Sequence, residues 1–121
     1  MFTVNLDGRE YKVFFRYGSD RPSGSRKDKR YTECVISRLD LEVDDKKYYT
    51  VVDSYKEYCS PLDNFEKNRG RKLALANLLK KLNYPKETRI LFWDAYFKSR
   101  GLKEVIKKHS DGFYADLVPN Y

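Results

Sequence analysis

The chain has little of the chemistry on which metal centres and disulfide scaffolds depend. Its 121 residues include two cysteines, Cys34 and Cys59, and one histidine, His109. Two cysteines without metal-ligand spacing exclude a disulfide-stapled scaffold and a zinc finger, and one histidine excludes a histidine-rich metal centre. We therefore expect no metal and no cofactor, and we expect both cysteines to behave as small buried residues.

Long apolar runs are missing too. None approaches the roughly 20 residues that span a bilayer, and the first residues lack the basic-then-apolar layout of a signal peptide. Charged residues make up 36% of the chain, which favours a soluble protein of a reducing, cytosolic compartment. Aromatic residues make up 16%, enough large side chains to build one core, so the length predicts a single domain over residues 1–121.

Recognisable catalytic motifs are absent as well. The sequence contains no GxSxG, HExxH or Walker pattern, and its acidic residues are scattered singly. The one adjacent acidic pair, Asp44-Asp45, is better explained as a turn than as a pair of catalytic carboxylates. The sequence therefore predicts a binding protein rather than an enzyme.

Alternating apolar residues predict strands in the N-terminal half. Residues 2–6 and 11–17 alternate on either side of Asp7-Gly8, which predicts a β-hairpin with a two-residue turn. The following stretch, 18–29, is rich in glycine, serine, proline and charge, and is expected to form an exposed loop.

A second hairpin is predicted from β-branched and aromatic residues. They are concentrated in residues 31–41 and 47–58, with Asp44-Asp45 as the turn between the two strands. Residues 1–59 are therefore expected to form an antiparallel sheet of about four strands.

After residue 60 the apolar period changes to that of a helix. Ser60-Pro61 suits the start of a helical turn. From Gly70 onward leucines recur at helical spacing, and Pro85 can open a second helix that ends near Arg100-Gly101. The leucine stripe of the first helix is Leu75, Leu78, Leu79 and Leu82, and the apolar face of the second is Ile90, Trp93 and Phe97.

The remaining segments complete the expected α+β fold. Residues 102–108 suit a short third helix, and the tail, 109–121, carries enough apolar side chains to dock on its own core or on a neighbouring subunit. The sequence thus predicts two to three helices, within 60–108, packed on the N-terminal sheet.

Positive charge is concentrated in the C-terminal half. The net charge is +7, and residues 67–108 alone hold 13 basic and 3 acidic residues, a local +10. Such an excess indicates a positive surface and an anionic partner, although a solvated surface that keeps the protein soluble is the plain alternative.

The best candidate for anion binding is Asn68-Arg69-Gly70-Arg71-Lys72. These residues lie where a loop is expected to enter a helix, so unpaired backbone amides, the helix dipole and guanidinium groups can all act on a phosphate. Glycine at 70 would allow close approach. The alternative is that Gly70 only permits tight packing while the basic side chains are solvated.

Aromatic rings near this segment are candidates for stacking on a nucleobase. The set consists of Phe65, Trp93, Tyr96 and Phe97. Most of these rings are equally well explained as part of the core.

Three stretches carry a resemblance to a known family. Residues 59–65 (Cys-Ser-Pro-Leu-Asp-Asn-Phe), 70–75 (Gly-Arg-Lys-Leu-Ala-Leu) and 92–97 (Phe-Trp-Asp-Ala-Tyr-Phe) follow a pattern common in small bacteriophage proteins. The order of these three stretches along the chain, and their residue types, resemble the pattern of the Thoeris anti-defence sponge family. The resemblance covers about residues 30–100 and depends most on residues 59–75.

This resemblance implies a phage protein of the host bacterial cytoplasm that sequesters an immune signal. The signal would be a cyclic ADP-ribose isomer made by TIR-domain enzymes, or another cyclic oligonucleotide, held without cleavage. The resemblance also implies a homo-oligomer, a dimer-based hexamer, with ligand bound between protomers. In this family pattern Arg71 would clamp phosphate beside Gly70, Phe65 or Phe97 would stack on adenine, and Asn64, Lys72 and Arg100 would line the pocket.

Two other functions stay open on the sequence. One is a phage protein that binds nucleic acid through the basic C-terminal surface, with strongly salt-dependent affinity. The other is an inhibitor that docks on an acidic surface of a host protein without needing a nucleotide.

Overall fold

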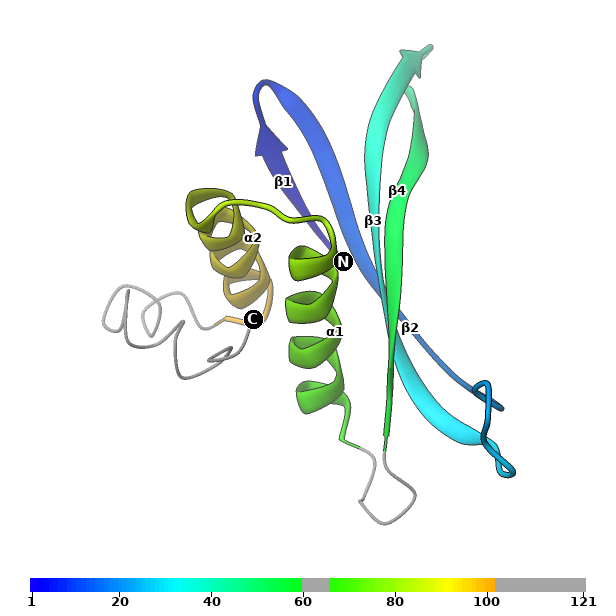
Figure 1. Cartoon of the computed structure of the whole chain (residues 1–121). Coiled ribbons are helices and arrows are strands. Elements are labelled where there is room, and N and C mark those ends of the chain that lie inside the picture. Colours follow the sequence, from blue (N-terminus) through cyan, green and yellow to red (C-terminus); the bar gives the residue numbers. More distant parts are fainter. Residues whose placement is uncertain (60–65, 102–121) are drawn as a thin grey trace.

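Four strands followed by two helices form an α+β fold, as the sequence predicts (Figure 1). The structure is a computed structural model that describes residues 1–59 and 66–101. The elements are β1 (Phe2–Leu6), β2 (Arg9–Asp20), β3 (Lys29–Val43), β4 (Lys46–Tyr58), α1 (Lys67–Lys81) and α2 (Lys86–Ser99). Three expected features lie outside the described residues: the turn at Ser60-Pro61, the third helix over 102–108 and the tail over 109–121.

The sheet is an antiparallel meander with the strand order β1-β2-β3-β4. Both short turns have positive φ at their two central residues, 52° and 80° at Asp7 and Gly8 and 50° and 64° at Asp44 and Asp45. Positive φ at both positions is what two-residue hairpin turns of type I′ require, and aspartate tolerates this region better than most residues. Both predicted hairpins are confirmed.

The expected loop over 18–29 is wrong at both ends, and β3 already begins at Lys29. β2 continues through Asp20, and Gly18 pairs with Tyr31 in β3. The glycine does not break the strand, because the Tyr31 side chain fills the space where a Cβ at position 18 would stand. The connecting loop is therefore limited to residues 21–28.

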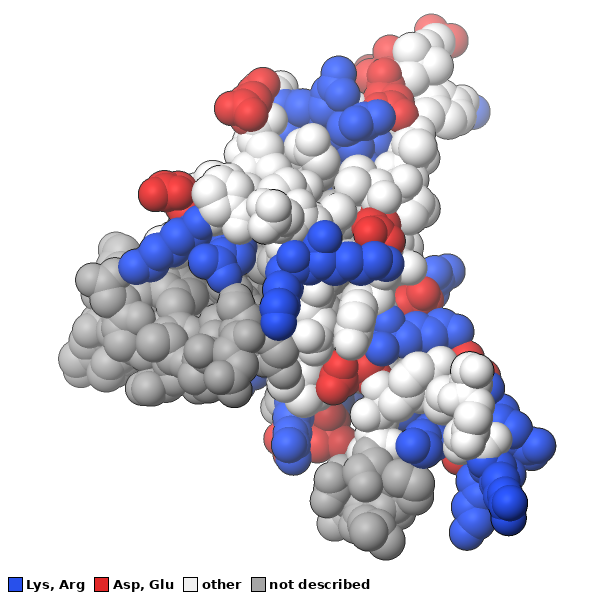
Figure 2. Space-filling view, viewed as in Figure 1, with Lys and Arg blue, Asp and Glu red and all other residues white. Residues whose placement is uncertain are grey.

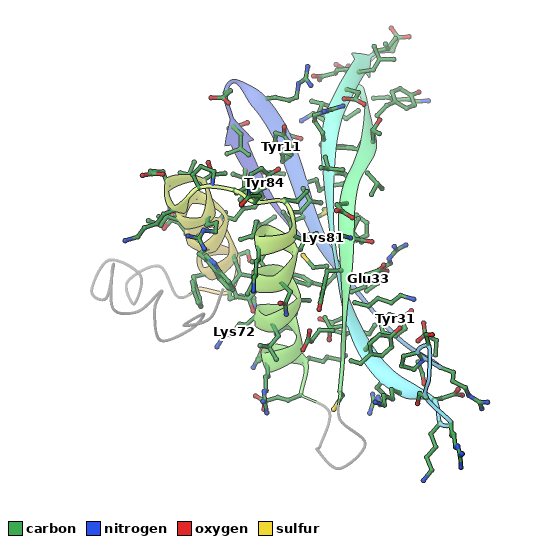
Figure 3. All side chains as sticks on the ribbon, in the orientation of Figure 1. Tyr11, Tyr31, Glu33, Lys72, Lys81 and Tyr84 are labelled. Carbon is green, nitrogen blue, oxygen red and sulfur yellow. The ribbon has the colours of Figure 1, made fainter. Side chains whose placement is uncertain are left out.

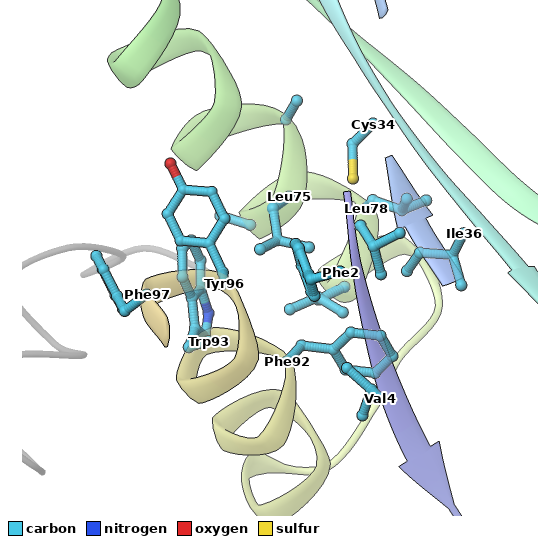
Figure 4. Close-up of a cluster of buried hydrophobic side chains, with 14 residues drawn as sticks. Phe2, Val4, Cys34, Ile36, Leu75, Leu78, Phe92, Trp93, Tyr96 and Phe97 are labelled. Atoms are coloured by element: carbon cyan, nitrogen blue, oxygen red, sulfur yellow. The ribbon is translucent and has the colours of Figure 1, made fainter. Parts of the chain in front are cut away.

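Both helices pack on the same face of the sheet, α1 over β3 and β4 and α2 over β1 (Figure 1). The core between these layers is built from the apolar positions that alternate along the strands and recur along the helices (Figure 4). Its fully buried members include Val13, Ile36, Leu75, Phe92 and Tyr96. Cys34 is also buried, as expected, and burial raises the pKa of its thiol.

The opposite face of the sheet has no described helix on it and is covered by its own long side chains. Basic groups lie over aromatic rings: the Nζ of Lys12 is 4.2 Å from the ring centre of Tyr49, and that of Lys56 is 4.5 Å from the ring centre of Tyr31. Beneath this layer Val35 is only 1% exposed. Amphipathic side chains thus replace a second layer of helices on this face.

The described helices match the sequence closely. α1 begins at Lys67, three residues before the expected start, and α2 begins directly after Pro85. α2 ends at Ser99, directly before Arg100-Gly101, where the end of the helix is predicted, and the glycine has a φ of 78°. Within residues 1–59 and 66–101 no helix combines the length and apolar character needed to cross a lipid bilayer.

Candidate ligand-binding site

The first turns of α1, the last turn of α2 and the second half of β2 meet at one end of the helix pair. Arg71 of α1 joins them, because its guanidinium contacts side chains from both neighbouring elements. The sequence brings these elements together through two features: a glycine on α1 that allows close approach to the sheet, and an aromatic cluster on α2.

Gly70 is the point at which α1 approaches the sheet most closely. A Cβ at this position would overlap the Oγ1 of Thr32 on β3. The amide N–H of Gly70 donates to the carbonyl of Glu66 at 3.0 Å, so it belongs to the helix and is not one of the unpaired amides expected there. Gly70 therefore permits close packing of α1 on the sheet, which is the alternative to anion binding that the sequence allowed.

Arg71 is buried, with only 7% of its surface exposed. Its Nη1 donates to the hydroxyl of Tyr17 at 2.8 Å, and its Nη2 donates to the Oδ1 of Asn68. The hydroxyl of Tyr96 also takes part in hydrogen bonding with the guanidinium and points toward α1 (Figure 4). All these partners are neutral, and Nε, which is buried as well, makes no hydrogen bond.

The electrostatic position of Arg71 is unusual. Burial disfavours its charged form, but hydrogen bonds with Tyr17 and Tyr96 outweigh this effect and raise the pKa above its usual value. The side chain is therefore a buried cation, and among the described residues no carboxylate pairs with it. Burying a charge without a counter-charge costs free energy, so such a group is a candidate for binding an anion.

The start of α1 adds further positive potential beside Arg71. Its first turn contains no acidic residue, and Glu66, the N-cap, makes no side-chain capping hydrogen bond. Amides in the first turn of a helix lack intrahelical partners and carry the positive end of the dipole. Lys67 lies 4.8 Å from the ring centre of Tyr17, so one more cation stands next to the guanidinium.

The predicted site residues are brought together only in part. Gly70 and Arg71 lie at this end of the helix pair, Lys72 is half-buried on α1 (Figure 3), and Arg100 is exposed at the end of α2. Phe97 is 1% exposed and stacks on Trp93 with 5.9 Å between ring centres, so it packs in the core, which is the other role that the sequence allowed. Asn64 and Phe65 lie outside the described residues.

Two important residues were missed from the sequence, Tyr17 and Lys67. Tyr17 is 41% exposed, and it is the described aromatic ring that both contacts Arg71 and reaches the surface. It looked like the last alternating position of a strand. Its contact with a residue 54 positions away depends on where α1 crosses the sheet, and no local pattern reports that crossing.

The described residues offer few other places for chemistry. They contain no group of three or more histidine, cysteine, aspartate or glutamate side chains that could hold a metal ion. A shallow groove of about 260 Å³ lies between residues 8–10 and residues 39–42, far from Arg71 along the sheet. Two carboxylates of this groove are paired with basic side chains: Asp40 meets Arg38 at 2.9 Å, and Glu10 meets Lys47 at 3.2 Å.

The candidate site is thus a buried guanidinium with neutral described partners, beside a partly exposed tyrosine and the start of α1, where Glu66 makes no side-chain capping hydrogen bond. Such an arrangement can hold an anion and place an aromatic ring beside it. Comparisons with protein-family models, with curated proteins and with solved structures give no match for this chain.

Proposed function

We propose that this protein binds a small nucleotide of the cyclic ADP-ribose class and holds it without cleaving it. On this proposal it acts as a bacteriophage sponge in the cytoplasm of the host, where it withdraws an immune signal from its sensor. The support has two parts: the resemblance of residues 59–75 to the Thoeris anti-defence sponges and the chemistry of the described site.

One observation carries the proposal, the burial of Arg71 among neutral partners. A guanidinium at 7% exposure whose hydrogen bonds go to two phenols and an amide keeps its full positive charge. A bound phosphate would supply the counter-charge that the described residues lack and would accept charge-assisted hydrogen bonds. The diphosphate of a cyclic ADP-ribose has this chemistry.

Neighbouring groups have complementary roles in this proposal. Lys67 and the first-turn amides of α1 would face the second phosphate, while the exposed part of the Tyr17 ring would pack against the base. Lys72 and Arg100 would contribute longer-range positive potential. Phe97 would act indirectly, by packing against Tyr96 with 5.2 Å between ring centres.

Assembly into a homo-oligomer is part of the same proposal. To compete with a sensor, a sponge needs micromolar affinity or better, about −8 kcal/mol. A diphosphate nucleotide reaches this affinity most readily in an enclosed pocket, and a second protomer beside the exposed Tyr17 would provide the enclosure.

The direct test is calorimetric titration of the full chain with a cyclic ADP-ribose isomer, followed by native mass spectrometry. We expect a Kd of micromolar or below, an oligomer that carries the ligand, and release of chemically intact ligand on heating. Arg71→Lys should weaken binding at least about 10-fold, because an ammonium keeps the charge but loses the planar fork.

Arg38→Lys is the matched control, since Arg38 is paired with Asp40 at the other end of the sheet. It should leave the affinity unchanged. A cleaved nucleotide would turn the proposal toward an enzyme, and equal effects of the two lysine variants would remove Arg71 from the site.

A further inference from the structure

β4 is the longer of the two edge strands of the sheet. The strand order β1-β2-β3-β4 leaves one side of β4 without a described partner strand, along the 13 residues of Lys46–Tyr58. The other edge strand, β1, has only five residues, and α2 packs on it (Figure 1). A short edge offers few backbone groups for pairing, whereas a long open edge is a template for another strand. β4 is therefore the edge at which the sheet can be extended.

The middle of β4 is apolar and exposed. Residues 48–52 carry no charge and include no proline or glycine. Tyr48, Val51 and Val52 are 52%, 58% and 37% exposed, and Figure 2 shows this part of the molecule as a largely white area on the upper right. Charges and proline are the usual protection of an exposed edge, and this stretch has neither. Such an edge is stabilised when another strand covers it.

A β-bulge in β4 restricts how this edge can pair with a second copy of itself. Two neighbouring residues of β3, 36 and 37, pair with Asp53 and Val51, which leaves Val52 as one extra residue in β4. Successive residues of a strand point to opposite faces of the sheet, so one extra residue shifts the alternation.

The side chains of β4 that face the helices therefore differ on the two sides of the bulge. After it, odd-numbered residues face them: Asp53 meets Lys81 of α1 at 3.0 Å, and Glu57 accepts a hydrogen bond from the amide of Asn77 at 3.2 Å. Before it, the even-numbered residues 46, 48 and 50 take this face. In an antiparallel pair of identical strands, opposite residues share a face only when one precedes the bulge and the other follows it.

One such register also brings together two charges of opposite sign. Neither Lys46 nor Glu57 forms an ion pair with another described residue. The two are equally far along the strand from the midpoint between Val51 and Val52. A two-fold axis at this midpoint sets Lys46 of each copy opposite Glu57 of the other, on the helix-facing side, and sets the valines opposite each other. The strand is thus complementary to itself in both its charged and its apolar positions.

We propose that two copies of this chain pair edge to edge through β4, antiparallel and with two-fold symmetry about the midpoint between Val51 and Val52. The two four-stranded sheets then form one continuous sheet, with the helices of both copies on the same side. This interface is separate from the site around Arg71, and the inference does not depend on the proposed sponge function.

The experiment measures the monomer–dimer equilibrium of the full chain by sedimentation equilibrium, without nucleotide. Lys46→Glu sets like charges opposite each other twice in the dimer and should raise the dimer dissociation constant at least about 10-fold, and so should Glu57→Lys. An equimolar mixture of these two variants restores both pairs of opposite charge, so it should form a heterodimer about as tight as the wild-type dimer. Val51→Lys, at an exposed position, should also weaken the dimer without lowering the melting temperature.

Lys27→Glu is the matched control, because it makes the same change of charge at an exposed position in the loop between β2 and β3. It should leave the dissociation constant unchanged. Equal weakening by Lys27→Glu and Lys46→Glu would overturn the proposal, since it would show an effect of net charge alone. A wild type that stays monomeric up to about 1 mM would overturn it as well, and so would a mixture of folded Lys46→Glu and Glu57→Lys chains that forms no heterodimer.

Discussion

The two ends of the sheet differ in net charge and in whether their basic side chains are paired with carboxylates. At the turn end, formed by the β1–β2 and β3–β4 turns, residues 38–47 hold three basic and four acidic residues, a net −1. Arg38 and Lys47 each meet a carboxylate within 3.2 Å. At the loop end, formed by the β2–β3 loop and the start of α1, residues 21–30 have a net +4, and Arg71 is buried with neutral partners.

This difference separates charges that the fold satisfies from charges that it leaves available. An exposed ion pair such as Lys47–Glu10 contributes little to stability, and its charges already neutralise each other. A buried guanidinium that the described residues leave without a counter-charge is favourable only if an anion compensates it or if water reaches it. The loop end is therefore where a ligand should act, and the turn end is the internal control.

The largest effect should come from the packing that holds the loop end together. Gly70→Val should lower the free energy of unfolding by about 3 kcal/mol, because the new side chain overlaps Thr32 on β3 and forces α1 away from the sheet. Urea denaturation measures this change. The valine should also reduce ligand affinity, since Arg71 is the next residue along the helix.

A double-mutant cycle tests whether the contact is the cause. Thr32→Ala alone should have little effect, because the buried Oγ1 of Thr32 makes no hydrogen bond that the mutation would break. In the background of Thr32→Ala, Gly70→Ala should cost measurably less than in the wild type. If the effects of Thr32→Ala and Gly70→Ala on stability are additive, Gly70 is required for a reason other than its contact with Thr32. The difference between the two ends of the sheet would then depend on Arg71 alone.

The second effect concerns the buried cation itself. Arg71→Met should reduce the affinity for a cyclic ADP-ribose isomer by about 2–3 kcal/mol, roughly 30- to 150-fold, through loss of charge-assisted hydrogen bonds. Without ligand, the free energy of unfolding should change by less than about 1 kcal/mol. The methionine fills similar space, and it removes a charge that burial disfavours.

Melting curves with and without ligand separate these two contributions. If Arg71→Met strongly lowers the melting temperature of the ligand-free protein, the arginine is a structural bridge between Tyr17 and Tyr96. The loop end would then resemble the turn end, with its charge used inside the fold.

The fold was more predictable than the site, for a physical reason. Alternation along residues 2–6 and 11–17 and the leucine stripe of α1 are local patterns, so strands, turns and helices followed from neighbours in sequence. The continuation of β2 through Gly18 was missed because it depends on a cross-strand partner, Tyr31.

The candidate site depends on distant contacts of the same kind. Arg71 is a candidate from the sequence alone, but its buried position depends on Tyr17, 54 residues away, and on Tyr96 on the other helix. Phe97 shows the reverse case: a ring that suited a stacking role in the sequence belongs to the core, where Trp93 stacks on it. The residue types indicate which side chains can bind an anion or stack on a base. Which of them lie together depends on where α1 crosses the sheet, and the sequence does not report that crossing.

The smallest effect tests the turn end, where charge is matched. Hydrogen bonds from Tyr49 and from Lys47 lower the pKa of Glu10 below its usual value. A carboxylate with a lowered pKa in the folded state stabilises the fold at neutral pH, and this contribution is lost as the pH falls below about 4. Glu10→Gln should therefore lose less stability than the wild type between pH 5 and pH 3, by an amount below about 1 kcal/mol because the pair is exposed.

Asp44→Asn, which removes an equal charge at the neighbouring turn, is the control in the same pH series of urea titrations. If Glu10→Gln changed the free energy of unfolding more than Arg71→Met does, the comparison of the two ends would be wrong, because the paired charges of the turn end would then matter more than the buried arginine.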